Sequence, residues 1–143
     1  MTAATTADIL HASAVSILGQ CVLILGPSGT GKSALALDLM SRGAGLVSDD
    51  RTQVRRVEGV VIASAPKALQ GLIEARGAGL LTADYSGPTP VKLVVDLAQK
   101  SVARLPDQRQ FTVLNVDIDL ICGQDLPNLT PVIIQYFKGG RGA

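Results

Sequence analysis

The chain has 143 residues, of which 47% are apolar and 17% are charged, and its formal net charge at pH 7 is +1. This composition is typical of a folded globular protein and excludes a disordered one. A net charge close to zero, with 3% aromatic residues and no tryptophan, argues against nucleic acid or an anionic membrane as the partner. We expect a single domain over residues 1–143, without a separate N-terminal domain.

The N-terminal stretch MTAATTADIL lacks the basic region and apolar core of a signal peptide. No run approaches the roughly 20 apolar residues that a membrane span requires. Cys21 and Cys122 lie in apolar runs without the close spacing of a metal or redox pair, so we expect buried, reduced thiols. These features predict a cytoplasmic protein.

Short apolar runs rich in Val and Ile predict strands along the whole chain. These runs begin at Ala12, Cys21, Gly45, Thr52, Val60, Val91, Phe111 and Pro131. The runs from Thr52 and Val60, joined through Glu58-Gly59, predict a hairpin. The run from Pro131, PVIIQYF, is expected to be the last strand.

Two segments predict helices. The first begins at Lys32 in GKSALALDLMSRG, whose leucines form a helical stripe and whose Gly43 suits a C-terminal cap. The second is PKALQGLIEARG, because Pro66 suits a first turn and Gly77 suits a stop. A strand, a loop, a helix and a returning strand require a parallel crossover, so the fold class is α/β or α+β, with a mixed sheet that carries the phosphate loop.

The stretch GPSGTGKS, from Gly26 to Ser33, matches the pattern G-x-x-x-x-G-K-[ST] of a P-loop. Its glycines let backbone N–H groups and the helix N-terminus bind phosphate oxygens. Lys32 would reach the β- and γ-phosphates of ATP, and the Ser33 hydroxyl would ligate Mg²⁺. The predicted nucleotide-binding residues are Gly26, Pro27, Ser28, Gly29, Thr30, Gly31, Lys32 and Ser33.

Two adjacent acids, Asp49 and Asp50, follow the predicted strand GLVS. A parallel crossover brings that strand end to the edge of the sheet where the P-loop lies. A carboxylate there can hold Mg²⁺ or accept a proton from a hydroxyl nucleophile, whereas an Asp that only caps the turn is the alternative. Alternation along a strand predicts different roles for the two acids, without deciding which acid has which role.

Four further residues are candidates. Glu74 could complete a Mg²⁺ shell and Arg76 could neutralise a transferring phosphate, although a solvated helix end explains both equally well. Asp96 follows the apolar run LVV and competes with the Asp pair as an acid of the Walker-B type. His11 is the one histidine, and an isolated histidine is more often structural than catalytic.

Taken in order, LHASAVSILGQCVLILGPSGTGKSALALDLMSRGAGLVSDD and APKALQGLIEARGAGLL resemble the catalytic domain of HPr kinase/phosphorylase. That family has a histidine before the P-loop strand, the loop itself, an apolar segment that ends in Asp-Asp, and an I-E-x-R-G motif. The resemblance runs from His11 to Leu81. The chain is similar to the short form found in alphaproteobacteria.

The resemblance implies an α/β core shared with HPr kinase and phosphoenolpyruvate carboxykinase, with ATP and Mg²⁺ as cofactors. It implies a protein serine kinase whose substrate is HPr, the small phosphocarrier of the sugar phosphotransferase system. Family members also remove the phosphate by phosphorolysis with inorganic phosphate, which releases pyrophosphate. They assemble as hexamers, so the resemblance implies a homo-oligomer.

The resemblance also implies roles for single residues. Asp50 matches the proton acceptor for phosphorylation, which is the donor in the reverse reaction. Ser33 and Glu74 match the Mg²⁺ ligands. His11 matches the active-site histidine, and Arg76 lies in a segment important for both reactions. The implied catalytic set is His11, Lys32, Asp50 and Arg76.

At its C-terminal end the chain departs from the family pattern, because Arg141 in GGRGA is a doubtful match to the family's arginine motif. Two other functions therefore stay open. One is a nucleotide-dependent binding or switch module without kinase chemistry. The other is a P-loop kinase that acts on a small metabolite.

Overall fold

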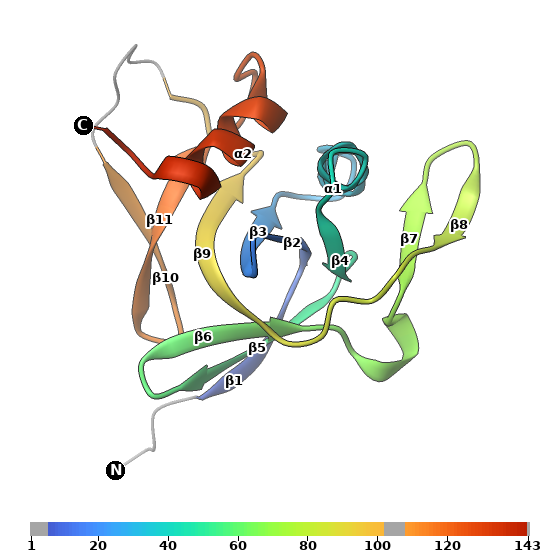
Figure 1. Cartoon of the computed structure of the whole chain (residues 1–143), viewed down its shortest axis with the longest axis horizontal. Coiled ribbons are helices and arrows are strands. Elements are labelled where there is room, and N and C mark those ends of the chain that lie inside the picture. Colours follow the sequence, from blue (N-terminus) through green and yellow to red (C-terminus); the bar gives the residue numbers. More distant parts are fainter. Residues whose placement is uncertain (1–5, 102–107, 143) are drawn as a thin grey trace.

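The computed structural model describes residues 6–101 and 108–142. Within these residues, nine strands form one curled mixed sheet (Figure 1). They are β1 (Ala7–Leu10), β2 (Ala12–Ile17), β3 (Gln20–Leu25), β4 (Gly45–Ser48), β5 (Thr52–Val57), β6 (Val60–Ser64), β9 (Thr89–Asp96), β10 (Arg109–Val113) and β11 (Val116–Cys122). The remaining elements are α1 (Lys32–Met40), a 3₁₀ helix (Lys67–Leu69), the hairpin of β7 (Leu72–Ala75) and β8 (Gly79–Thr82), and α2 (Leu129–Gly139).

Seven strands follow the order β1-β5-β6-β9-β3-β2-β4, and β11 joins β9 while β10 pairs with β11. The strands β3, β9 and β11 run parallel, and Asp96 at the end of β9 pairs with Leu25 of β3 and Cys122 of β11. Because β2 is antiparallel to both β3 and β4, these two run in the same direction with β2 between them. The expected parallel crossover through α1 is confirmed, with one strand inserted.

This insertion places the start of β2 at the P-loop edge of the sheet. Ala12 pairs with Leu25, the last residue of β3, and Ala14 pairs with Ser48, the last residue of β4. The segments around His11, Gly26 and Asp49 therefore meet at one edge. Three stretches that lie apart in the sequence are brought together by strand register alone.

Apolar side chains form two layers, one on each face of the sheet. In β3, Leu23 faces a layer that joins residues of β5 and β6 to residues of β10 and β11 across the curl. Its neighbours Val22 and Ile24 face the second layer, which packs against α1 and α2. Figure 1 shows both helices on the same side of the sheet, while the β7–β8 hairpin stands beside α1. Alternation along β3 thus lets one strand serve both layers.

The predicted helix from Pro66 to Gly77 is wrong. The segment contains the short 3₁₀ helix and then β7, which pairs antiparallel with β8. Gly71, with φ of 72°, lies between them in a backbone conformation that an α-helix cannot contain. The apolar residues that suggested a helical face belong instead to two separate elements.

The predicted strand from Pro131 is also wrong, because the segment belongs to the 11-residue helix α2. Its buried residues Thr130, Ile133, Tyr136 and Phe137 recur at helical spacing. Pro131 lies in the first turn, where its missing N–H costs no hydrogen bond. The β-branched run thus gave a misleading strand signal.

Other expectations have mixed outcomes. The β5–β6 hairpin and the helix from Lys32 are confirmed, and Gly43, with φ of 103°, follows that helix. The run from Phe111 is split by a turn at Leu114 and Asn115, so it contributes to two strands, β10 and β11. Strand β1 was not predicted.

The two cysteines are free and buried as expected, and burial raises the pKa of the Cys21 thiol. None of the helices in the described part of the chain is long and apolar enough to span a membrane.

Candidate active site

The P-loop sequence connects the end of β3 to the start of α1. Gly31 is the N-cap of α1 with φ of 98°, and no side chain caps this end of the helix. The first N–H groups of a helix have no partners within the helix, so this end can donate hydrogen bonds to an anion. The backbone geometry therefore fits the phosphate site that the sequence pattern predicts.

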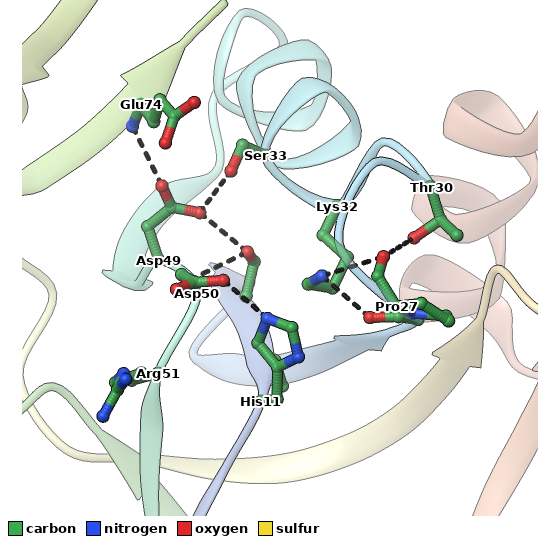
Figure 2. Close-up of polar contacts among 12 residues, drawn as sticks. His11, Pro27, Thr30, Lys32, Ser33, Asp49, Asp50, Arg51 and Glu74 are labelled. Atoms are coloured by element: carbon green, nitrogen blue, oxygen red, sulfur yellow. Dashed lines mark hydrogen bonds and ion pairs between the residues drawn. The ribbon is translucent and has the colours of Figure 1, made fainter.

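The loop is folded around its own lysine. The Lys32 Nζ donates to the carbonyl oxygens of Gly26, at 2.8 Å, and Pro27, at 3.3 Å. The Thr30 hydroxyl also donates to the Pro27 carbonyl, at 2.7 Å (Figure 2). A Cβ at Gly26 would lie 2.4 Å from the Thr30 Oγ1, and its φ of 151° is itself unfavourable for other residues. This compact loop therefore requires glycine at that position.

A pocket of about 500 Å³ opens in front of the loop, a volume typical of small-ligand sites. Its walls come from the loop, α1, the end of β4 and the β7–β8 hairpin. The lining residues are Ser28, Gly29, Gly31, Lys32, Ser33, Ala34, Leu37, Asp50, Glu74, Ala75 and Arg76. The pocket thus unites the loop with Asp50, Glu74 and Arg76, which the sequence predicts to act with it.

Asp49 is buried and joins three elements. Its Oδ1 accepts hydrogen bonds from the Ser13 and Ser33 hydroxyls, each at 2.7 Å, and its Oδ2 accepts the Glu74 backbone N–H at 2.9 Å. These donors lie on β2, α1 and β7. Asp49 therefore fixes both residues predicted to bind Mg²⁺, although its own carboxylate is already hydrogen-bonded within the protein.

Asp50 has a different environment from its neighbour. It is exposed, lines the pocket, and bonds through Oδ1 to the His11 Nε2 at 2.7 Å. Figure 2 shows Asp49 directed toward Ser33 and Glu74, whereas Asp50 is directed toward His11. The two acids therefore have different partners, as strand alternation predicts, and the exposed one faces the pocket.

Glu74 and Arg76 reach the pocket from the hairpin rather than from a helix end. Glu74 lies on β7 with an exposed side chain, and Arg76 follows in the turn that leads to β8. Both residues line the pocket. Glu74 lies in the strand and Arg76 in the turn that follows it, so the hairpin carries both residues. The β-hairpin is therefore what brings both side chains to the same site.

Asp96 and Arg141 lie in other environments. The Asp96 carboxylate accepts hydrogen bonds from the Ala98 N–H and the Gln99 amide, so it caps the turn after β9. Arg141 donates to the Leu120 carbonyl and lies over the Tyr136 ring. Neither is among the residues that line the pocket.

The donor atoms at the pocket suit Mg²⁺. Ser33 offers a hydroxyl and Glu74 a carboxylate, both oxygen ligands, and Mg²⁺ usually binds through one or two carboxylates together with substrate phosphates and water. Among residues 6–101 and 108–142, no cluster of three His, Cys, Asp or Glu side chains could hold a metal by itself.

Sequence reasoning missed Ser13, and it left the role of Asp49 undecided. Ser13 is fully buried on β2, two residues after His11. The sequence signal that could have identified Ser13 is a polar residue inside an apolar strand, close to the single histidine. The bonds that converge on Asp49 could not be read from the sequence, because its partners come from three separate elements.

These features define an α/β domain with a P-loop sequence at the end of a parallel strand and acidic residues at the same edge of the sheet. Comparison with known proteins specifies this class further. Residues 2–130 match the family described as HPr Serine kinase C-terminal domain, and the chain belongs to that family.

Individual relatives agree with this assignment. The chain is 38% identical to the HPr kinase/phosphorylase of Bordetella pertussis, over 88% of this chain and 47% of the relative. It is 41% identical to that of Cupriavidus necator, over 78% of this chain and 38% of the relative. The chain thus spans less than half the length of these curated relatives.

A solved structure confirms the fold. The Hpr(Ser) kinase/phosphatase from Coxiella burnetii superposes with a TM-score of 0.79 and 26% sequence identity. The match covers 92% of this chain and 88% of that chain. The expected α/β core of the HPr kinase type is therefore confirmed.

Proposed function

We propose that this domain is a cytoplasmic Mg²⁺–ATP-dependent kinase that phosphorylates a serine of an HPr-like phosphocarrier protein. The observation that carries the proposal is the Asp50 carboxylate, which is bonded to His11 and faces the pocket in front of the P-loop. Family membership and the names of the relatives support HPr as the substrate. Assembly into a hexamer, which the resemblance implies, stays a prediction.

In the proposed reaction, the serine oxygen of HPr forms a bond to the γ-phosphorus while the bond to the β–γ bridging oxygen breaks and ADP leaves. Asp50 accepts the proton of the serine hydroxyl, and His11 holds one Asp50 oxygen in place. Lys32 and the N–H groups at the start of α1 bind the phosphate oxygens. Arg76, at the pocket wall, neutralises charge on the transferred group.

Ser33 and Glu74 would hold Mg²⁺ at the pocket. When bound, the ion neutralises charge on the phosphate oxygens. Asp49 fixes the relative positions of these two residues, because its carboxylate accepts hydrogen bonds from the Ser33 hydroxyl and the Glu74 backbone N–H.

The same residues would serve phosphorolysis. An oxygen of inorganic phosphate forms a bond to the phosphorus of phosphoserine-HPr while the serine O–P bond breaks, so the products are serine-HPr and pyrophosphate. Asp50 returns its proton to the serine oxygen. The phosphate site at the start of α1 can bind inorganic phosphate as it binds a nucleotide phosphate.

The test is phosphate transfer from Mg²⁺–ATP to purified HPr by the wild-type chain and by Asp50→Asn. We expect Asp50→Asn to lower turnover at least about 100-fold, because a neutral amide cannot accept the proton. ATP binding should be retained, since the P-loop is unchanged. Asp84→Asn, an exposed site that does not line the pocket, is the control and should keep wild-type turnover.

Other outcomes would contradict the proposal in distinct ways. Wild-type turnover by Asp50→Asn would exclude Asp50 as the proton acceptor. Nucleotide binding without transfer to HPr would favour the switch module, and transfer to a small metabolite instead of HPr would favour a metabolite kinase. Adding inorganic phosphate to phosphoserine-HPr and measuring pyrophosphate tests the reverse reaction.

A further inference from the structure

The turn that carries Asp50 has an unusual backbone. The Arg51 N–H donates to the Asp49 carbonyl at 2.7 Å, and Asp50 between them has φ of 67°. A hydrogen bond between residues two apart around a positive φ is a γ-turn of the rare, strained type. Asp tolerates this region better than most residues, but surrounding contacts must hold such a conformation in place.

Ser13 supplies such contacts from the neighbouring strand. The Ser13 hydroxyl donates to the Asp49 Oδ1 at 2.7 Å. The Oγ of this hydroxyl also accepts a hydrogen bond from the Asp50 N–H at 3.2 Å. Ser13 is fully buried, so bulk water does not reach its hydroxyl. The Ser13 hydroxyl thus bonds both the side chain of Asp49 and the backbone of Asp50.

The position of Ser13 on β2 explains how it reaches both acids. Its neighbours Ala12 and Ala14 belong to the layer inside the curl, whereas Val15 belongs to the layer beneath α1. By alternation Ser13 shares the face of Val15, the side on which α1 and Ser33 lie. The pairing of Ala14 with Ser48 then sets Ser13 beside the residues that follow β4.

We propose that Ser13 is a positioning residue that sets the Asp50 carboxylate in the pocket by fastening the strained turn at Asp50. The inference rests on the proposed function, in which Asp50 accepts the proton. Only a side chain that both donates and accepts can make the two bonds, which a serine or threonine hydroxyl does and an alanine does not. Ser13 itself is not among the residues that line the pocket.

The kinetic test compares phosphate transfer to HPr by Ser13→Ala and Ser13→Thr. We expect Ser13→Ala to lower kcat by about tenfold to a hundredfold, because a small displacement of a catalytic group has effects of this size. The KM for ATP should stay nearly constant, since the Ser33 hydroxyl keeps its own bond to Asp49 and the Lys32 contacts are unchanged. Ser13→Thr keeps the hydroxyl and should recover most of kcat. An unchanged kcat in Ser13→Ala would overturn the inference.

The control is Thr130→Val. Thr130 is also buried, and its hydroxyl donates to the Asp38 carboxylate at 2.5 Å, between the two helices and outside the pocket lining. This variant loses a comparable hydrogen bond, so it reports the effect of destabilisation alone. We expect it to keep wild-type kcat. A kcat loss in Thr130→Val equal to that in Ser13→Ala would assign the effect to general stability and overturn the inference.

A second measurement needs no substrate. Amide hydrogen exchange of Asp50, followed by NMR on the ligand-free chain, should be about tenfold faster in Ser13→Ala than in wild type, because the amide loses its acceptor. Ser13→Thr should show the wild-type rate. An unchanged Asp50 rate in Ser13→Ala would overturn the inference even if the enzyme transfers phosphate. If the wild-type chain transfers no phosphate to HPr, the proposed function fails while this readout still decides the role of Ser13.

Discussion

The backbone and the side chain of Glu74 lie in different environments. Its N–H is bonded to the buried Asp49, while its exposed carboxylate lines the pocket beside Ser33. A change in the carboxylate therefore leaves the bond that anchors β7 in place. This separation makes the residue well suited to a test of the proposed metal site.

We expect Glu74→Gln to raise the Mg²⁺ concentration needed for half-maximal kinase turnover by at least about tenfold, because the ligand loses its charge. Nucleotide binding without metal should change little, since the P-loop keeps its donors. Titration of the kinase rate with Mg²⁺, and of a fluorescent ATP analogue without Mg²⁺, measures the two effects. Glu58→Gln, in the exposed β5–β6 turn, is the control. Identical Mg²⁺ titrations for Glu74→Gln and wild type would remove Glu74 from the metal site.

At the same scale, the sequence predicts only part of the site. The P-loop pattern identifies Lys32 and Ser33, because phosphate binding depends on a continuous stretch of chain. Alternation predicts that Asp49 and Asp50 differ, and their hydrogen bonds do differ. The role of Ser13 could not be predicted, since it depends on the insertion of β2 between β3 and β4.

At the scale of elements, four predicted strand runs begin where the structure has strands β2, β4, β5 and β6, namely those from Ala12, Gly45, Thr52 and Val60. The segments from Pro66 and Pro131 were assigned to the wrong type. In the first segment, apolar residues three or four positions apart suggested a helix, although Gly71 interrupts the segment. In the second, Val and Ile suggested a strand, whereas burial against the sheet selects a helix. Local propensity is weak compared with tertiary packing in both cases.

The helical packing of α2 predicts a sharp contrast between neighbouring residues. Ile133 is fully buried beneath the helix, whereas Val132 is 39% exposed. Ile133→Ala should destabilise the chain by about 2–5 kcal/mol, because it leaves a cavity in the core. Val132→Ala should change stability by less than about 0.5 kcal/mol. Urea unfolding of both variants measures the difference, and equal losses would contradict the packing of α2 described here.

At the scale of the whole molecule, the site forms where distant segments meet at one edge of the curled sheet. Residues near positions 11–13, 26–33, 49–50 and 74–76 belong to separate elements, and strand pairing together with the contacts of Asp49 brings them together. Fold class could be predicted because the P-loop unit requires a parallel crossover. The order of the strands could not, because pairings between distant segments leave no local pattern.

Global stability at high pH depends on Tyr136, which links α2 to the sheet. Its hydroxyl donates to Asp119 on β11. Burial and this carboxylate raise the pKa of Tyr136 from its ordinary value of 10.0 to about 12. In the unfolded chain the phenol loses its proton near pH 10, so between about pH 10 and 12 the unfolded state holds fewer protons than the folded state. Its contribution to stability is therefore complete below pH 10 and is lost as the pH rises toward 12.

We expect the free energy of unfolding of the wild-type chain to fall between pH 10 and about 12, and Tyr136→Phe to remove the part of this fall that the phenol causes. Urea unfolding at a series of pH values in this range measures the slope for each variant. Tyr85→Phe leaves the bond between Tyr136 and Asp119 intact and should keep the wild-type slope. Identical slopes for wild type and Tyr136→Phe would show that the phenol titrates alike in both states, because only a group whose pKa differs between them makes stability depend on pH.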